Sequence, residues 1–333
     1  MKTIHPFILG SGRTGQVIAR SLDILNQLHT DQFQIRIPVF IPRGKSFGDM
    51  AKGLENSALF IANPPGLHEQ AIVQAEKAGF SAVFCEKPVC TDIEQIASLK
   101  KVKKNVPVFH VYRQQWGPQT IKEMILAGEL GEIISIEGKI WQPSMAHRAL
   151  EPSARPQDWK TDPKLNGNFG VILDLGVHWA DLVSFLVGQT PTRAKGWHSK
   201  INNEPPYHDT HLHLDLEFPS SIKTFASISK VVHGATNDLE VSILGSKKAA
   251  TWKFLNPDEI IVGKGRDRNI MVRKENRWGS RQPPFHGLGW IEGYIEIIRQ
   301  GLFELVGLPI TSYPNLKESL LITEKLLSSQ ITE

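Results

Sequence analysis

The stretch from residue 170 to residue 187 is mostly apolar, but Asp174, His178 and Asp181 interrupt it at intervals of four and three. If the stretch is helical, this spacing places the three side chains on one stripe, because residues three and four apart share a helix face. Burying polar groups without partners costs about 2 to 7 kcal/mol each, and more for a charge. We therefore expect the stripe to meet other polar groups or a wet cavity.

A second group of residues has the spacing of a phosphate-binding turn. The segment "GSGRTG" follows the strand-like "PFILG" and has glycines in the G-x-G-x-x-G pattern. Such glycines allow a tight turn and a close approach of the backbone to a pyrophosphate, while the following helix begins at the anion. The alternative is a glycine-rich turn that binds nothing. The residues predicted to bind a dinucleotide here are Gly10, Gly12, Arg13, Thr14 and Gly15.

The residues after the second expected strand bear on which dinucleotide binds. A site for NAD usually has an acidic residue there, which holds the ribose hydroxyls. Here "IRIPVFI" is followed by Pro42, Arg43, Gly44, Lys45 and Ser46. Cations and a hydroxyl suit a 2′-phosphate, so this loop favours NADP, with NAD as the alternative. Arg43 and Lys45 could instead be solvated loop residues.

The first third of the chain alternates strand-like and helix-like segments. Strands are expected at 6–10, 35–41, 58–63, 82–87 and 107–112, and helices at 14–28, 45–54, 66–78 and 92–103. Alternation of this kind predicts a doubly wound parallel sheet with helices on both faces. We therefore expect residues 1–115 to form a Rossmann-type dinucleotide-binding domain.

Beyond residue 130 the pattern changes to successive strands. They are expected at 132–142, 193–200, 209–218, 222–230, 238–244, 248–255, 259–263 and 269–274. Strands without intervening helices predict an open, mostly antiparallel sheet flanked by helices on one face. Residues 116–333 are therefore expected to form a second domain around this sheet, so that the fold class is α/β plus α+β.

The composition limits the classes of protein to which the chain can belong. The chain has 333 residues, 41% of them hydrophobic and 22% charged, with a net charge of +4. We see no membrane-length apolar run and no signal peptide, and the two cysteines are too few for a disulfide framework, which favours a cytoplasmic location. The charge is spread along the chain, so we expect no nucleic-acid partner. The basic stretch 264–281 is expected to be an exposed hairpin and loop, or else a surface that attracts an anion.

The segment "HDTHLHLDLEF" raises the alternative of a metal site. Asp209, His211, His213 and Asp215 fall on one face of a strand at period two. Neighbouring same-face residues diverge too far to close a tetrahedral site easily. We therefore expect no metal, and interpret these residues as a polar face of the sheet that a second subunit could cover.

Several motifs together resemble those of the Gfo/Idh/MocA family, named for glucose-fructose oxidoreductase, inositol dehydrogenase and rhizopine catabolism. Glu86, Lys87 and Pro88 resemble its E-K-P signature, and "ILDLGVHWADL" resembles its D-x-G-x-H element. The segments "ALFIANPPGLHEQ", "VYRQQWGPQ", "NDLEVSILGSKKAATWKF" and "HGLGWIEGYIEIIRQG" are similar to further family segments. The resemblance covers almost the whole chain.

This resemblance implies roles for individual residues. His178 would take the proton of a substrate hydroxyl as hydride leaves, since an imidazole can titrate near neutral pH. Lys87 would hydrogen-bond the same oxygen, and Asp174 would orient the histidine or bind a neighbouring hydroxyl. Asp181 would buttress His178 or a loop. The alternative is that Asp174 and His178 are a structural helix pair.

The resemblance also implies binding residues and an assembly. Cofactor contacts fall on Asn63, Pro64, His68, Glu86, Lys87 and Arg113. Substrate contacts fall on Lys87, Tyr112, Asp174 and His178, with further candidates in a loop expected at 142–167: His147, Arg148, Arg155, Trp159 and Lys160. A homodimer or homotetramer through the open sheet is implied.

The chain departs from the family pattern in two places. "GNFG" at 167–170 replaces a glycine triplet, and the acidic residue after the second strand is missing. We expect an NADP-preferring oxidoreductase that interconverts a hydroxyl and a ketone on a sugar, cyclitol or polyol. The alternatives are a catalytically silent sensor of the same fold and a reductase of another carbonyl or an unsaturated ring.

Overall fold

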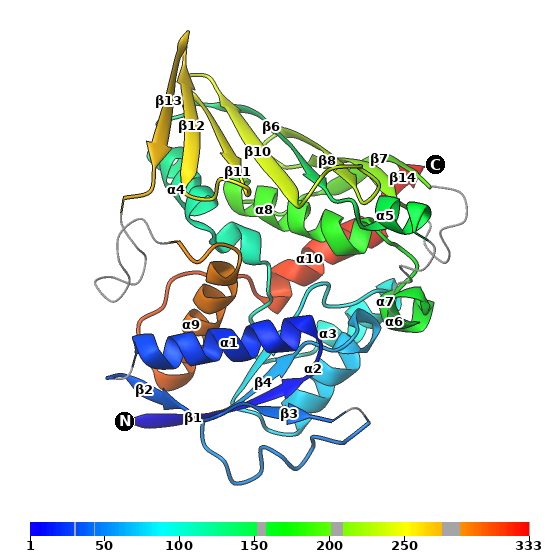
Figure 1. Cartoon of the computed structure of the whole chain (residues 1–333), viewed down its shortest axis with the longest axis vertical. Coiled ribbons are helices and arrows are strands. Elements are labelled where there is room, and N and C mark those ends of the chain that lie inside the picture. Colours follow the sequence, from blue (N-terminus) through cyan, green and yellow to red (C-terminus); the bar gives the residue numbers. More distant parts are fainter. Residues whose placement is uncertain (30, 43, 152–157, 201–208, 275–286, 333) are drawn as a thin grey trace. The chain divides into compact units, whose positions relative to one another are not determined.

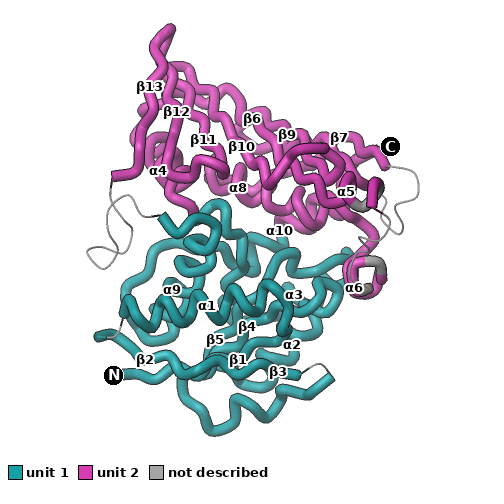
Figure 2. The backbone as a smooth tube through the Cα atoms, viewed as in Figure 1, with its two compact units in different colours: residues 1–114, 277–320 teal, residues 115–276, 321–333 magenta. Residues whose placement is uncertain are grey.

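The chain forms two compact units in the computed structural model, which describes residues 1–29, 31–42, 44–151, 158–200, 209–274 and 287–332. The first unit contains residues 1–114 and 277–320, and the second contains residues 115–276 and 321–333 (Figure 2). The first crossing lies next to the expected boundary at 115. The difference is that residues 277–320 return to the first unit instead of staying in the second.

The return has a physical cause in the helix α9 (Ile291–Val306). Its apolar residues lie in one buried cluster with those of α1 (Arg13–Leu28), including Ile18 and Leu22 from α1 and Ile298 and Leu302 from α9. Phe60 and Phe84 of the central sheet belong to the same cluster. Helix α9 therefore completes the core of the nucleotide-binding unit.

The sheet of the first unit is parallel, as expected, with the order β2-β1-β4-β5. Its strands are β1 (Lys2–Leu9), β2 (Phe33–Ile35), β4 (Ser57–Ile61) and β5 (Ala82–Cys85), with α2 (His68–Lys77) between β4 and β5. The expected strand 35–41 is split, because β2 pairs with the start of β1 whereas β3 (Val39–Ile41) pairs with its end. Pro38 lies in the break and has no N–H to donate to a ladder.

Three expected elements differ from the structure. The predicted helix 45–54 is a series of turns, in which Gly53 has a φ of +73°. The predicted helix 92–103 is reduced to η2 (Ile93–Gln95) and α3 (Ile96–Leu99). The predicted strand 107–112 makes a bridge from Val108 to Cys85 and then turns into η3 (Val111–Gln114). In each case the residue pattern was apolar enough for a regular element, but turns interrupt it.

The second unit contains the expected open sheet. Its order is β13-β12-β11-β10-β6-β9-β8-β7-β14, with parallel pairs only between β6 and β9 and between β7 and β14 in the described residues. The strands are β6 (Ile133–Trp141), β7 (Arg193–Ser199), β8 (His211–Glu217), β9 (Lys223–Ser229), β10 (Asp238–Gly245), β11 (Ala249–Lys253), β12 (Glu259–Lys264), β13 (Asp267–Val272) and β14 (Gln330–Thr332). The helices are α4 (Trp116–Leu126), α5 (Ser144–Leu150), α6 (Asp158–Thr161), α7 (Pro163–Asn166), α8 (Val177–Val187) and α10 (Leu316–Leu327), the last of which begins in the first unit.

One face of this sheet packs against helices and the other does not (Figure 1). Along β8, Leu212, Leu214 and Leu216 are buried, whereas the alternate residues are more exposed. Helix α8 lies close to β6, because a Cβ added to Gly138 would come 2.6 Å from the Trp179 ring. A side chain larger than hydrogen at residue 138 would therefore clash with this ring and with the Glu240 carbonyl oxygen, which the Cβ would approach to 2.1 Å.

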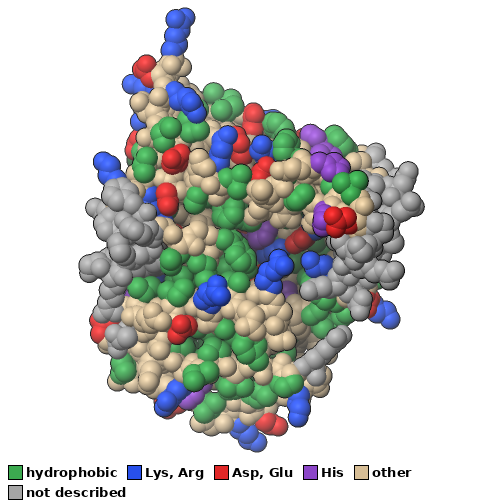
Figure 3. Space-filling model, in the orientation of Figure 1, with side chains coloured by type: hydrophobic (Ala, Val, Ile, Leu, Met, Phe, Trp, Pro, Cys, Tyr) green, Lys and Arg blue, Asp and Glu red, His purple; other side chains and the backbone are tan. Residues whose placement is uncertain are grey.

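The surface shows no gathering of one charge on the face that Figure 3 draws. Blue Lys and Arg side chains there are interspersed with red acidic ones. The basic stretch forms the β12–β13 hairpin over residues 264–272, with β13 exposed along its length, while residues 275–281 lie outside the described part. None of the described helices combines the length and the apolar character that crossing a bilayer needs.

Candidate active site

The glycine turn lies between β1 and α1 and fits a dinucleotide. Gly10 has a φ of +118°, and a Cβ there would come 2.4 Å from the Ala62 carbonyl oxygen. A Cβ on Gly15 would come 2.0 Å from the carbonyl oxygen of Gly10, so both positions require glycine. A Cβ on Gly12, the residue before α1, would meet nothing within 4 Å. The turn thus leaves open space at a helix N-terminus that carries no acidic residue, where phosphate binds well.

A second observation supports a bound group beside this turn. Among the described residues, Asn63 Oδ1 is buried and has no hydrogen-bond partner. Asn63 and Pro64 follow β4, whose C-terminal end lies next to that of β1 in the parallel sheet. An unsatisfied buried acceptor is costly, so a donor from a ligand would stabilise it. Arg13 and Thr14 begin α1 at the same edge.

The loop after β3 carries the predicted NADP determinants. Lys45 and Ser46 are exposed, and the Lys45 N–H donates to the Pro42 carbonyl oxygen at 3.1 Å. Ser46 Oγ accepts from the Gly48 N–H at 3.4 Å, which shapes the following turn. Arg43 lies outside the described residues. The described part of the loop from 42 to 48 holds no carboxylate.

His68 was predicted to contact cofactor, but the structure buries it as a brace. Its Nδ1 lies 2.7 Å from the Pro88 carbonyl oxygen and its Nε2 lies 2.8 Å from the Asn63 carbonyl oxygen. A neutral imidazole has one N–H, so the ring donates to one of the two carbonyls at a time. Burial lowers the pKa of His68. The ring therefore connects the end of β4 to the segment that carries Lys87.

The Glu86-Lys87-Pro88 segment follows β5, and its Lys87–Pro88 peptide bond is cis. The buried Glu86 carboxylate accepts hydrogen bonds from the Tyr294 hydroxyl at 2.7 Å and from the Lys87 N–H at 3.1 Å. Burial and the charge of Glu86 raise the pKa of Tyr294 well above its usual value. Glu86 thereby fixes the backbone of Lys87 at the C-terminal edge of the sheet, the edge that also holds the glycine turn.

Tyr112 and Arg113, predicted to contact substrate and cofactor, are both buried in η3. Arg113 Nη2 donates to Glu318 Oε2 of α10 at 2.6 Å, and the neighbouring His110 Nε2 lies 2.9 Å from Ser319 Oγ. The ion pair with Glu318 thus fixes the position of the Arg113 guanidinium. Its role as a cofactor contact stays a prediction.

The polar stripe Asp174, His178, Asp181 begins in a π-helical turn, η4 (Ile172–Gly176), and continues along α8. The N–H groups of Leu175 and Gly176 both donate to the Val171 carbonyl oxygen, at 2.8 and 2.9 Å. Single π-helical turns are frequent at functional sites. Exposure falls along the stripe, because the Asp174 side chain is 49% exposed whereas His178 and Asp181 are buried. Asp174 therefore lies at the accessible end of the stripe, and His178 follows it one helical turn further on.

Two groups that the sequence interpretation missed hold this turn in place. Lys230 Nζ lies 2.6 Å from Asp174 Oδ2, and it donates to the Gly170 carbonyl oxygen at 2.6 Å. The Asp209 carboxylate accepts from the N–H groups of Gly170, Val171 and Ile172. The expectation that Asp209 shares a sheet face with His211, His213 and Asp215 is therefore wrong, because it is fully buried before β8 begins.

The remaining residues that were predicted to contact substrate lie in α5 and α6 or outside the described part. Trp159 lies in α6, where Lys160 Nζ stands 5.4 Å from the centre of its ring. Arg155 and the side chain of Arg148 lie outside the described part. His147 Nε2 lies 3.6 Å from Glu151 Oε2 on the exposed surface. A Cβ added to Gly176, at the end of the π-helical turn, would make ordinary contact with Leu212 at 3.6 Å.

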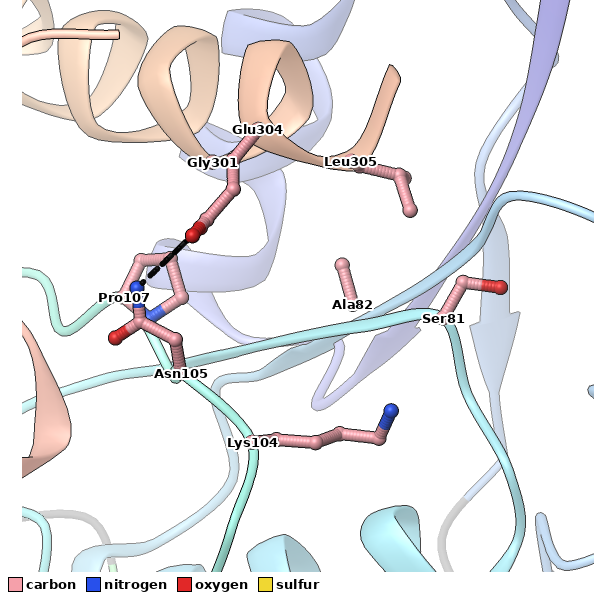
Figure 4. Close-up of a pocket in the computed structure, with 8 residues that line it drawn as sticks. All are labelled: Ser81, Ala82, Lys104, Asn105, Pro107, Gly301, Glu304 and Leu305. Atoms are coloured by element: carbon pink, nitrogen blue, oxygen red, sulfur yellow. Dashed lines mark hydrogen bonds between the residues drawn. The ribbon is translucent and has the colours of Figure 1, made fainter. Parts of the chain in front are cut away.

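Two further features bear on ligand binding. Among the described residues, no group of three or more His, Cys, Asp or Glu side chains could hold a metal ion. A cavity of about 330 Å³ in the first unit lies where β5 begins and is bordered by α9, as Figure 4 shows. There Glu304 accepts hydrogen bonds from Asn105 and Tyr313. Since β5 begins there, this cavity is at the opposite edge of the sheet from the glycine turn.

A glycine-rich turn on a parallel sheet, joined to an open-sheet domain, is typical of dinucleotide-dependent oxidoreductases. Residues 8–112 match the model described as "Oxidoreductase family, NAD-binding Rossmann fold", and residues 119–251 match the "GFO/IDH/MocA C-terminal domain". The chain belongs to the GFO/IDH/MocA family of oxidoreductases.

Individual relatives agree with this placement. Inositol 2-dehydrogenase of Rhizobium meliloti is 25% identical over 305 residues, which are 85% of this chain and 82% of that protein. Glucose-6-phosphate 3-dehydrogenase of Bacillus subtilis is 28% identical over 149 residues, or 43% of this chain and 40% of that protein. Like the latter, several of the curated relatives match over about two-fifths of their own length.

Solved structures share the fold over the whole chain. An oxidoreductase domain protein from Kribbella flavida has a TM-score of 0.86 at 16% identity, with 99% of this chain and 96% of that chain covered. An inositol dehydrogenase homolog complexed with NAD+ from Azotobacter vinelandii has a TM-score of 0.79 at 18% identity, with coverage of 99% and 95%. The expected architecture is thus confirmed.

Proposed function

We propose that this protein transfers a hydride between a nicotinamide cofactor and a carbon that alternates between hydroxyl and ketone on a sugar, cyclitol or related polyol. The observation that carries the proposal is the start of the polar stripe, where a buried lysine and a buried aspartate hold the half-exposed Asp174 in a π-helical turn that leads into His178. A turn built from charged side chains costs desolvation energy that apolar packing would avoid. A role of the turn in catalysis would account for this desolvation cost.

The proposed roles follow from chemistry. When bound, the nicotinamide supplies or accepts the hydride. His178 takes the hydroxyl proton, and since its Nδ1 is buried, Nε2 is the nitrogen that we assign to the substrate. Lys87 brings a positive charge to the developing alkoxide, and Asp174 orients the histidine or binds a neighbouring hydroxyl. Lys87 belongs to the first unit, and Asp174 and His178 belong to the second.

The cofactor is proposed to be NADP in preference to NAD. Lys45 and Ser46 offer a cation and a hydroxyl in a loop whose described part has no carboxylate, which is the chemistry that a 2′-phosphate requires. The glycine turn, Asn63 and the first turn of α1 would hold the pyrophosphate and its neighbours.

The test is the appearance of reduced nicotinamide absorbance when the purified protein meets inositols, aldoses, sugar acids and polyols, with NADP+ and NAD+ in parallel. Lys87→Ala and His178→Ala should each lower turnover by a factor of about 100 or more while they spare cofactor binding. The exposed Lys103→Ala and His233→Ala are matched controls. Unchanged turnover in both site variants would refute the catalytic assignment.

The same assay separates the alternatives. A silent sensor would bind NADPH without turnover on any substrate, and a reductase of another carbonyl or ring would consume NADPH only with those compounds. The sensor is less favoured, because a silent relative has no chemical need for Lys87, Asp174 and His178 together. Product analysis would identify the bond that changes.

We also propose that the open sheet mediates self-association. Its face without helices carries Trp197 and Phe225, with exposed fractions of 46% and 43%, and Trp197 stacks on His213 with ring centres 4.2 Å apart. Aromatic residues at such exposure are enriched in interfaces. Light scattering of the wild type and of a Phe225→Glu variant would test this, since a dimer or tetramer should dissociate in the variant.

A further inference from the structure

Lys230 is a buried cation directly after β9, and nothing in its neighbourhood along the chain explains why it is there. Its Nζ reaches two groups that lie far from it in sequence. It lies 2.6 Å from Asp174 Oδ2 and 2.6 Å from the Gly170 carbonyl oxygen that it donates to. One ammonium group therefore connects the carboxylate proposed for the active site to the backbone that leads into it.

The position of Lys230 follows from the pairing of β8 with β9. His211 lies opposite Ser229, so the residues just before β8 lie beside the residue just after β9. The Lys230 N–H donates to the Thr210 carbonyl oxygen at 3.1 Å, and the Met145 N–H donates to the Lys230 carbonyl oxygen at 2.9 Å. The backbone of Lys230 is thereby fixed on both sides before its side chain reaches out.

Asp209 binds the other backbone group of Gly170 and the two N–H groups that follow it. The Gly170 N–H donates to Asp209 Oδ1 at 2.5 Å, while the Gly170 carbonyl accepts from Lys230. The next two N–H groups, of Val171 and Ile172, donate to Asp209 Oδ2 at 2.9 and 2.7 Å. Asp209, just before β8, and Lys230, just after β9, thus hold the backbone that leads into the π-helical turn. They fix the last residue of "GNFG", the segment where the chain departs from the family pattern.

The charge arrangement differs from that of ordinary surface pairs in this unit. Lys248 and Glu129 form an ion pair at 2.9 Å, with side chains 29% and 46% exposed. Exposed pairs of this kind contribute little to stability. The Lys230 side chain is only 11% exposed, so its charge must be compensated by the groups around it, and Asp174 is one of them. A neutral residue could close the same space without this desolvation.

We infer that Lys230 is a positioning residue, which holds the Asp174 carboxylate so that Asp174 and His178 are presented in one orientation, while its hydrogen bond to the Gly170 carbonyl oxygen anchors the lysine itself. This inference rests on the proposed function, because it assigns a purpose to the pair within that reaction. Lys230 acts through Asp174 and does not touch the substrate.

The test is a double-mutant cycle with Lys230→Met, Asp174→Asn and the double variant, followed by kcat, KM and the dissociation constant of NADPH. Lys230→Met should lower kcat by a factor of about 10 or more in the wild-type background, but by no more than about twofold when Asp174 is already Asn, because the group that it positions has lost its charge. NADPH binding should stay unchanged. Equal losses of kcat in the two backgrounds, or no loss in either, would overturn the inference.

Two further variants test whether the positive charge of Lys230 is what kcat depends on. Lys230→Arg retains the charge and should recover most of the kcat that Lys230→Met loses; an arginine variant as slow as the methionine variant counts against an electrostatic role. Lys248→Met is the control for loss of a lysine that pairs with a carboxylate elsewhere in the unit, and it should keep the wild-type kcat.

The same variants separate this inference from the proposed function. If the wild type turns over none of the substrates, the proposed function fails. The urea midpoints of unfolding then test the coupling of Lys230 to Asp174 by itself, without any assay of activity. The midpoint should fall on Lys230→Met in the wild-type background and much less in the Asp174→Asn background. Equal falls would show that Lys230 does not act on Asp174.

Discussion

The hydroxyl of Tyr294 donates a hydrogen bond of 2.7 Å to Glu86 Oε1, although 208 residues separate the two in sequence. Tyr294 lies in α9 and Glu86 lies directly before Lys87, so the helix that completes the first unit also supports the edge of the sheet that carries Lys87. Both side chains are buried. The bond thus joins the stability of this unit to the placement of Lys87.

Replacing Tyr294 with Phe should therefore weaken both properties. The buried Glu86 carboxylate loses a donor, which should lower the free energy of unfolding by about 1 to 3 kcal/mol and reduce turnover. Urea unfolding and the dehydrogenase assay measure the two effects. Tyr313→Phe is the matched control, because the carboxylate that Tyr313 bonds, Glu304, is exposed. A wild-type unfolding midpoint in Tyr294→Phe would show that the bond contributes nothing.

Acid should destabilise the protein through two buried histidines. Burial lowers the pKa of His110 well below its usual value, with the charges of Arg113 and Lys87 acting in the same direction, and burial also lowers the pKa of His68. In the unfolded chain both pKa values return to about 6.5, so below that pH the unfolded state binds more protons than the folded state. The stability present at higher pH is lost as the pH falls through this range.

The free energy of unfolding should accordingly decline between about pH 7 and pH 5. Urea titrations across this range measure the slope, and His110→Gln should make it shallower. His233→Gln, which replaces an exposed histidine, should keep the wild-type slope. An unchanged slope in His110→Gln would mean that His110 is not the group that takes up the proton.

The loop after β3 should determine cofactor preference. Lys45→Ala removes a cation proposed to contact the 2′-phosphate and should raise the KM for NADP+ about tenfold with little change for NAD+. Ser46→Asp should shift the preference toward NAD+, since a carboxylate repels the phosphate and can accept ribose hydroxyls. Lys52→Ala, an exposed lysine in the following turns, is the control. Equal effects on the two cofactors would contradict the NADP assignment.

Asp209 should be needed for the shape of the turn that precedes Asp174. Asp209→Asn keeps the size but replaces an acceptor oxygen with an NH2 group, so it cannot accept from all three N–H groups at once. We expect the free energy of unfolding to fall by about 2 kcal/mol, together with a lower kcat. Asp215→Asn, on the exposed side of β8, should change neither. Wild-type kcat in Asp209→Asn would show that the turn forms without this carboxylate.

Sequence patterns predicted what depends on neighbours along the chain. The glycine turn, the parallel sheet, the strands of the second unit and the D-x-G-x-H helix could all be predicted, because periodicity and turn residues are local signals. The predicted helix 45–54 failed because Gly48 and Gly53 interrupt it, and the structure has turns there. Local apolar content alone did not decide between a helix and a series of turns.

The rest depended on distant pairings that no single segment reveals. Lys230 and Asp174 are brought together by the register of β8 with β9, and Tyr294 reaches Glu86 only because α9 packs on the first unit. Asp209 was noticed for the wrong reason, since its spacing from His211 suggested a shared strand face. A side chain that acts just before a strand begins does not follow the alternation of that strand.

The discontinuous make-up of the first unit has a consequence for biosynthesis. Helix α9 supplies Ile295, Ile298 and Leu302 to the same core as α1, yet nearly the whole second unit is translated between these two helices. Chains fold domain by domain as they leave the ribosome. We therefore expect the amino-terminal segment to keep the apolar surface that α9 covers exposed until α9 emerges, and a fragment that stops near residue 115 to keep it exposed permanently.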